Sequence, residues 1–196
     1  MRIFLLAILA IGALAGETPA KEPVQELAVG DALPPLRGSF LTGKAATLPE
    51  AANGRPALLL LGFTYDSRFA VEAWAKAFRA SASGGSAVLF EVPVISGMAR
   101  MGRWFIESGM RRGTPKEDHE HVITVYGNAD AWKKRVGFQD PQAAYLLLLD
   151  AKGHVVWRHQ GGYSEQGFAS LTRALDSLRA SHGGALRGAV LPRFSI

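Results

Sequence analysis

Two almost wholly apolar runs constrain the fold of this chain more than any other feature. One covers residues 57–63 and contains four consecutive leucines, and the other covers residues 144–149. A strand that is apolar at every position, rather than at alternate positions, is typical of a strand covered on both faces. The sequence therefore predicts a central sheet with helices packed on its two sides.

Helix and strand patterns alternate around these runs. Polar residues at 66 and 67 predict a cap for an amphipathic helix, with Asp66 or Ser67 as the capping side chain. Apolar residues then recur at helical spacing at Phe69, Ala73, Trp74, Ala77 and Phe78. The other predicted elements are a hairpin turning at 42–44, strands at 87–95 and 121–126, helices at 97–112 and 128–136, a hairpin turning at 150–153, and a last helix from Ser164 to a stop at Gly183-Gly184.

This order of elements implies parallel crossovers finished by an antiparallel pair. It resembles the thioredoxin fold, an α/β fold of three layers with a central mixed sheet, a C-terminal β-hairpin and a final helix. The segment VGDALPPLRGSFLTGKAATLPEAANGRPALLLLGF also resembles the first part of redoxin and peroxiredoxin domains. Thioredoxins have a proline about six residues before the aspartate that ends the central antiparallel strand. Here that position is Ala144, and Pro141 lies three residues earlier.

A second resemblance covers residues 29–171. The chain has a Pro-acid-x-His segment at 115–119, Tyr126-Gly127 at a strand end, Val136-Gly137 after a short helix, and the pattern YxxLLDxxGxxxWxxxG at 145–161. These features resemble the ATP synthase assembly factors of the ATP-ten type and their exported bacterial relatives. The resemblance implies a thioredoxin-like protein that helps a membrane complex to assemble and requires no thiol centre.

The chain contains no cysteine. Thiol-disulfide exchange needs a thiolate that attacks a disulfide sulfur, and no other natural side chain replaces it. The turn at 62–68, where a thiol oxidoreductase of this fold would carry its cysteine pair, therefore cannot support disulfide exchange or thiol peroxidase activity.

The first residues have the pattern of an export signal. Arg2 is followed by 12 apolar residues at 3–14, and Ala13-Leu14-Ala15 supplies small residues for a signal peptidase. We expect a signal peptide at 1–15, a linker at 16–28, one thioredoxin-like domain at 29–182 and a tail at 183–196. Export to the periplasm is the predicted location, and an inner-membrane anchor formed by an uncleaved first segment is the alternative.

The turn after the first apolar run is the first candidate binding site. Tyr65, Asp66, Ser67 and Arg68 lie where a helix begins, and free backbone N–H groups at such a position favour an anion. Helix capping explains Asp66 and Ser67 with no further assumption. A catalytic Ser67 would need a neighbouring base, so no catalytic residue is predicted.

Two histidines two residues apart form a weaker candidate site. On an extended segment His119 and His121 would share one face, and nearby Asp118 or methionines could complete a zinc or copper site. Two ligands alone do not make a metal centre. A solvated strand start is the competing interpretation, and no metal or other cofactor is predicted.

The segment 97–116 is the most basic part of a chain with a net charge of +5. Its candidate contact residues are Arg100, Arg103, Trp104, Arg111 and Arg112, and Met98, Met101 and Phe105 are predicted to form its apolar face. Such a helix suits a membrane headgroup layer or an acidic groove of a partner, and an ordinary crossover helix with a solvated face is the alternative. Nucleic acid is not expected because aromatic residues do not alternate with the basic ones.

Together these features predict a redox-inactive binding protein of the cell envelope that acts as an assembly or chaperone factor for a membrane complex. Its expected partners are a protein client embedded in the membrane and the membrane surface. The competing hypothesis is a ligand- or metal-binding protein, or an enzyme independent of cysteine, that uses the turn at 65–68 or the two histidines.

Overall fold

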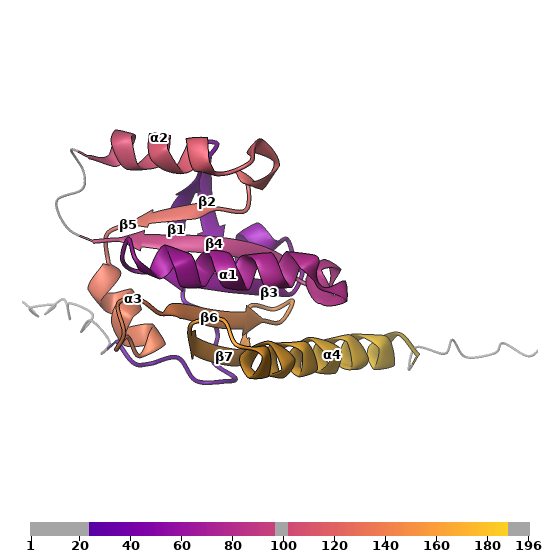
Figure 1. The fold of residues 1–196 in the computed structure, drawn as a ribbon. Helices are drawn as coiled ribbons and strands as arrows, with labels where there is room; N and C mark the ends of the chain where they lie inside the picture. Colours follow the sequence, from indigo (N-terminus) through magenta and orange to yellow (C-terminus); the bar gives the residue numbers. More distant parts are fainter. Residues whose placement is uncertain (1–23, 97–101, 188–196) are drawn as a thin grey trace, which may run out of the picture.

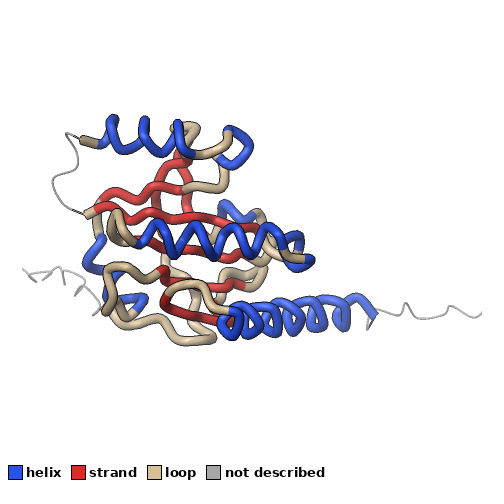
Figure 2. The backbone as a smooth tube through the Cα atoms, viewed as in Figure 1, coloured by secondary structure: helices blue, strands red, loops and turns tan. Residues whose placement is uncertain are grey.

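The computed structural model describes residues 24–96 and 102–187. Seven strands and four α-helices in these ranges form one mixed sheet with helices on both faces (Figures 1 and 2). The elements are β1 (Leu36–Phe40), β2 (Ala45–Leu48), β3 (Ala57–Gly62), α1 (Ser67–Ala80), β4 (Val88–Ile95), α2 (Arg103–Gly113), β5 (Ile123–Tyr126), α3 (Ala129–Val136), β6 (Ala144–Leu149), β7 (Val155–Gly161) and α4 (Glu165–Arg187).

The strands lie in the order β2-β1-β5-β4-β3-β6-β7. β3, β4 and β5 are parallel, whereas β6 runs antiparallel to β3 and pairs with β7 in a hairpin. At the other side of the sheet, the hairpin of β1 and β2 joins β5 in antiparallel pairing. This arrangement confirms the predicted three-layer α/β fold with a C-terminal hairpin and a final helix.

The two apolar runs form the centre of the core, as the sequence predicts. Leu58, Leu59, Leu60 and Leu61 of β3 are all 0% exposed, and their side chains alternate between the two faces of the sheet. One face packs against α1 and α4. The other packs against α3 and the segment that precedes β1. The prediction that strands of this composition are covered on both faces is confirmed.

The carboxyl ends of β3 and β4 lie at one end of the sheet, on the left in Figure 1. α1 and α2 begin at this end, so the candidate turn and the start of the basic helix lie on the same side of the molecule. No helix of the described residues combines the length and apolar character needed to cross a bilayer.

One predicted helix boundary differs from the structure, and another lies outside the described residues. α4 continues through Gly183-Gly184 to Arg187, so the predicted stop at the two glycines was wrong. α2 begins at Arg103, and the predicted start at 97 lies outside the described residues together with Met98, Arg100 and Met101.

Candidate functional site

Two hydroxyl side chains close the turn between β3 and α1. The backbone N–H of Ser67 donates to Thr64 Oγ1 over 3.1 Å, and the backbone N–H of Thr64 donates to Ser67 Oγ over 3.3 Å. Ser67 Oγ also donates to the carbonyl oxygen of Thr64 over 2.8 Å. This reciprocal pattern is that of a capping box, with serine in the position usually held by glutamate or glutamine. It closes the turn just before α1, which begins at Ser67 and has Asp66 as its N-cap residue.

The capping box corrects the predicted role of Asp66. This residue directly precedes the helix, but its side chain makes no capping hydrogen bond. Ser67 is 1% exposed, and its hydroxyl proton points to a backbone carbonyl rather than to a base. A nucleophilic serine must instead donate its hydroxyl proton to a neighbouring base. The geometry therefore gives Ser67 a structural role in the turn.

Thr64 also connects this turn to the loop that precedes β6. Its Oγ1 donates to the carbonyl oxygen of Pro141 over 2.5 Å. The Asp140–Pro141 peptide is trans, because the one cis peptide bond of the described residues precedes Pro49. Sequence reasoning placed Thr64 in the turn without giving it a role, because its partner is 77 residues away in the chain.

The loop at Pro141 is held in place by the hydroxyl of Tyr145, a residue that is 1% exposed. This hydroxyl accepts hydrogen bonds from the backbone N–H groups of Gln139 and Asp140, each over 2.9 Å, and donates to the carbonyl oxygen of Asp140 over 3.0 Å. One phenol thus bonds to three backbone groups of this loop, of which the Asp140 carbonyl also accepts from the backbone N–H of Ala143 over 3.3 Å.

The outer side of the turn carries an aromatic and cationic surface, the turn patch, formed by Tyr65, Arg68 and Phe69. The guanidinium carbon of Arg68 lies 3.7 Å from the ring centroid of Tyr65 and 4.4 Å from that of Phe69. Tyr65 is 75% exposed and Phe69 is 60% exposed. The cation is therefore held against two aromatic rings that themselves face solvent.

Phe69 and Ala73, two of the apolar residues that recur at helical spacing, are exposed on α1 rather than buried against the sheet. The residues of α1 that are buried are Ser67, Val71, Trp74, Ala75 and Phe78. At 100° per residue, Phe69 lies about 180° around the helix from Phe78, so it points away from the sheet. Measuring this angle from the two largest apolar residues of the helix would have identified Phe69 as a surface residue.

The candidate residues of α2 form a separate surface. Trp104, Arg111 and Arg112 are exposed on this helix. Phe105, which was predicted to lie on an apolar face, is 71% exposed, so that prediction was wrong. Arg103 belongs to α2, but its side chain lies outside the described part, as does the whole of Arg100.

The structure does not bring the two candidate histidines together. His119 and Glu120 lie in a turn after a short 3-10 helix at Lys116–Asp118, so the expected extended segment was wrong. His119 Nε2 lies 3.0 Å from the carbonyl oxygen of Thr114, whereas His121 Nδ1 lies 4.0 Å from Asp118 Oδ1. Among the described residues, no three histidine, aspartate or glutamate side chains form a group that could hold a metal ion.

Near His121, a half-buried carboxylate, that of Glu91, is paired with an arginine. Arg79 Nη2 lies 2.7 Å from Glu91 Oε1 and 3.8 Å from Asp118 Oδ1. Burial raises the pKa of Glu91, and the hydrogen bond and charge of Arg79 oppose that shift. This cluster joins the end of α1 to β4 and is explained by packing.

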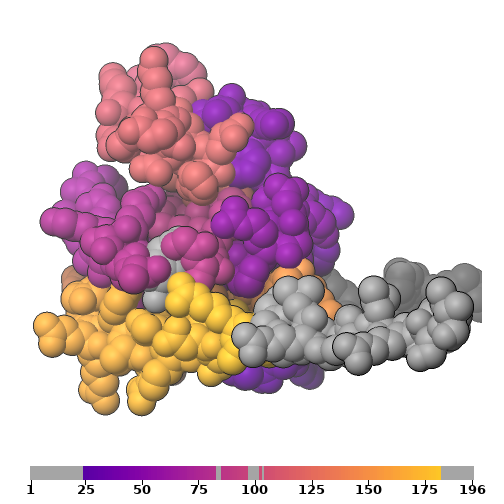
Figure 3. All heavy atoms as spheres, turned by 90° about the vertical axis from the view of Figure 1, so that its right-hand side faces the viewer, coloured from indigo at the N-terminus to yellow at the C-terminus, as the bar shows by residue number. Residues whose placement is uncertain are grey.

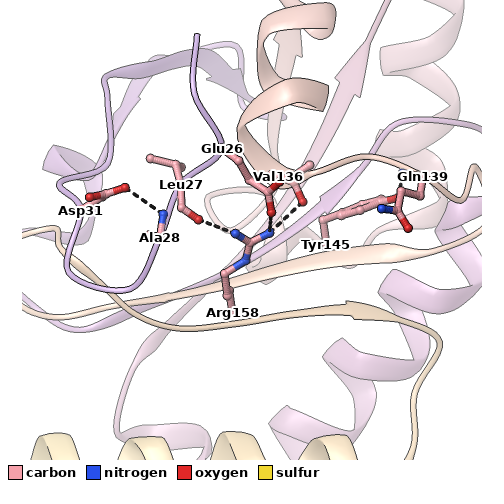
Figure 4. A network of polar contacts seen from close by, with 8 residues as sticks. All are labelled: Glu26, Leu27, Ala28, Asp31, Val136, Gln139, Tyr145 and Arg158. Atoms are coloured by element: carbon pink, nitrogen blue, oxygen red, sulfur yellow. Dashed lines mark hydrogen bonds and ion pairs between the residues drawn. The ribbon is translucent and has the colours of Figure 1, made fainter.

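Arg158 of β7 ties the first described residues to the sheet (Figure 4). Its guanidinium donates to the carbonyl oxygen of Leu27 over 2.5 Å, to that of Val136 over 3.2 Å, and to the carboxylate of Glu26. Gly137, with φ of +67°, leaves space for this carboxylate, because a Cβ there would lie 2.7 Å from Glu26 Oε1. The segment before β1 is therefore part of the folded domain.

His159 of β7 lies between two tryptophans. Its ring is parallel to that of Trp157, with 5.6 Å between centroids, and its centroid is 5.3 Å from that of Trp74. Burial among these rings lowers the pKa of His159, because the protonated form loses its hydration.

This shift predicts a loss of stability in acid. In the unfolded chain His159 takes up a proton as the pH falls through about 6.5, while in the folded protein it stays neutral until a lower pH. The melting temperature should therefore fall between pH 6.5 and that lower pKa. A His159→Gln variant should show a smaller decrease over the same range in thermal melts followed by circular dichroism. Parallel curves for the two proteins would contradict the assignment.

Comparison with known proteins supports the fold and goes no further. No protein-family model and no curated protein sequence matches the chain. Among solved structures, yeast Sco1 with copper bound is similar at a TM-score of 0.53 and 17% identity, covering 76% of this chain and 95% of Sco1. A protein assigned as a thiol:disulfide interchange protein, DsbE, from Chlorobium tepidum is similar at a TM-score of 0.51 and 16% identity, covering 78% of this chain and 99% of that one. Likeness at this level of identity shows that the chain has the thioredoxin-like fold.

Proposed function

We propose that this chain is a redox-inactive thioredoxin-fold binding protein of the cell envelope that assists the assembly of a membrane complex. The observation that carries the proposal is the turn between β3 and α1. Its Ser67 hydroxyl is used within the capping box, and Thr64 Oγ1 joins the box to the loop at Pro141, while Tyr65, Arg68 and Phe69 face outward. The turn thus presents a surface for contact rather than a group for reaction.

The chemistry of the turn patch fits a protein client. Tyrosine, phenylalanine and arginine are enriched in the cores of protein interfaces, where aromatic side chains and arginine supply most of the binding energy. The contact between Arg68 and the two rings holds all three side chains in place before binding, which reduces the entropy lost on association.

The specific client that we propose is the membrane part of ATP synthase. The support for this choice is the resemblance of residues 29–171 to ATP synthase assembly factors, together with the export signal expected at 1–15. The turn patch then serves as the contact for a subunit that is waiting to be assembled.

Two experiments test the two levels of this proposal. A photoreactive phenylalanine analogue at position 65 should form crosslinks with a membrane protein in cells, and silence at this position would refute a client contact at the turn patch. Deletion of the gene should lower the amount of assembled ATP synthase on native gels. An unchanged amount would refute ATP synthase as the client.

Variants of the turn patch test whether this surface is needed for assembly in the second experiment. A Tyr65→Ser, Phe69→Ser protein should fail to restore assembly, because anchor residues of an interface each contribute about 2 kcal/mol or more. Val29→Ser is the control, since it removes a side chain that is 62% exposed elsewhere on the molecule. It should restore assembly like the original chain. Immunoblots must show equal amounts of all three proteins.

A further inference from the structure

Helix α2 presents two faces of different composition. Ile106 and Met110 are half-buried, and at 100° per residue they lie on the opposite side of the helix from Trp104 and Phe105. Trp104 and Phe105 are 67% and 71% exposed, and their rings meet edge to face with 4.8 Å between centroids. No side chain of α2 that the structure describes is fully buried.

The exposed aromatic pair shares its face with two arginines. At 100° per residue, Trp104, Phe105, Ser108, Arg111 and Arg112 fall within an arc of about 120°. Arg111 forms an ion pair with Glu107 at 2.9 Å, whereas Arg112 forms no ion pair with the residues that the structure describes. The arc contains these two arginines and no acidic residue, so this face is cationic as well as aromatic.

This combination of groups matches the boundary layer of a bilayer. Tryptophan and phenylalanine are stable where headgroups meet acyl chains, and arginine can reach the phosphates while its methylene groups lie on apolar surface. Near an anionic membrane each arginine adds electrostatic attraction. From these contacts and charges we infer that the outward face of α2 binds the surface of an anionic phospholipid bilayer.

The position of α2 in the fold favours a planar partner. Figure 1 shows this helix outside the edge of the sheet, and Figure 3 shows the segment that contains it as the upper extremity of the molecule. A flat surface can therefore reach the aromatic pair and both arginines together. An acidic protein remains the other occupant of matching charge, and the experiment below separates it from a bilayer.

The primary test is sedimentation of the purified protein with vesicles. The protein should bind vesicles made of equal amounts of phosphatidylglycerol and phosphatidylcholine. Its affinity for vesicles of pure phosphatidylcholine should be lower by about tenfold or more, since the anionic surface attracts the arginines. Binding should weaken strongly at about 1 M salt, where charges are screened beyond about 3 Å. This measurement needs no client, so its result is independent of the proposed function.

Trp104 supplies a reporter within the proposed contact. The other tryptophans are more enclosed, because Trp74 and Trp132 are 0% and 4% exposed and Trp157 is half-buried with its Nε1 bonded to Ser170 Oγ at 2.8 Å. Brominated lipids in the anionic vesicles should therefore quench Trp104 selectively. A Trp104→Phe variant should still bind and should show little quenching.

Matched variants assign the binding to α2. Two double variants should each lower the affinity for anionic vesicles by about tenfold. One carries Trp104→Ser together with Phe105→Ser, and the other carries Arg111→Gln together with Arg112→Gln. Arg173→Gln, Arg179→Gln removes the same charge from exposed positions on α4 and should bind like the original protein. All of these side chains are exposed, so unchanged melting temperatures will show that the variants fold.

Three results would overturn the inference. The first is the absence of binding to anionic vesicles at low salt, and the second is an equal loss of binding in the α4 control. The third is binding to soluble polyglutamate, lost in the α2 variants, without binding to vesicles. That result would assign the face to an acidic protein partner.

Discussion

A Trp74→Ala variant is expected to lose about 3–5 kcal/mol of unfolding free energy, the usual cost of removing a buried tryptophan side chain. Trp74 is 0% exposed, and its ring lies 5.5 Å from that of Tyr163 and 6.3 Å from that of Phe168. Its Nε1 donates to the carbonyl oxygen of Gly161 over 3.2 Å. The substitution leaves a cavity between α1, β7 and the start of α4. Urea unfolding followed by circular dichroism measures the loss.

Trp104→Ala is the matched control for this variant, because it removes the same side chain from a position that is 67% exposed. Surface substitutions of this kind usually change the unfolding free energy by less than about 0.5 kcal/mol. Equal losses in the two variants would show that burial of Trp74 does not account for its contribution.

The second large effect is expected for Tyr145→Phe, which removes one oxygen atom from the core. The backbone N–H groups of Gln139 and Asp140 then lose their acceptor, and the carbonyl of Asp140 loses a donor. Leaving a group unsatisfied costs about 1–3 kcal/mol when it is buried. Gln139 and Asp140 are exposed residues, so water replaces part of the lost bonding and we expect a total loss of about 1–3 kcal/mol. Urea unfolding gives the total, and amide hydrogen exchange at Gln139 and Asp140 reports the loop directly.

Tyr65→Phe is the control for the loss of a phenol, since Tyr65 is 75% exposed. It should leave stability unchanged. Protection of the Gln139 and Asp140 amides at their original level in Tyr145→Phe would contradict the assigned role of the hydroxyl. The same result would also mean that Pro141 does not depend on Tyr145 for its position opposite Thr64.

Most of the architecture could be predicted because its signals are local. The four leucines of β3 and the run in β6 are apolar at every position, and only a strand covered on both faces explains such a pattern. Gly137 in the left-handed conformation ends α3 at the predicted place. Ser164 caps α4 as expected, with its Oγ accepting a hydrogen bond from the backbone N–H of Gly167 over 3.1 Å.

The errors arose where a local preference did not decide the structure. Gly183-Gly184 has poor helix propensity, yet α4 continues past it to Arg187. His119 was expected on an extended segment, but the 3-10 helix at Lys116–Asp118 places it in a turn. The carbonyl oxygen of His119 accepts a hydrogen bond there from the backbone N–H of the distant Leu41 over 3.1 Å. Phe69 is a different case, because its position on α1, about 180° from Phe78, already predicts an exposed side chain.

The candidate site was predictable in place but not in geometry. The end of a buried strand followed by polar residues and a helix located the turn at 64–68. The capping box of Thr64 and Ser67, the contact of Arg68 with two rings, and the bond from Thr64 to Pro141 all depend on distances that spacing does not reveal. The same holds for α2, whose outward face became clear only with the burial of Ile106 and Met110.

The turn between β3 and α1 is closed by hydroxyl groups rather than by thiols, so the shape of its surface does not depend on redox conditions. A pair of thiols would switch between a free and a bonded state with the reduction potential of the compartment. The hydroxyls of Thr64 and Ser67 have no such states, so oxidants leave their hydrogen bonds unchanged. A partner would therefore meet the same shape in oxidising and in reducing surroundings, and its release must be governed by something other than electron transfer.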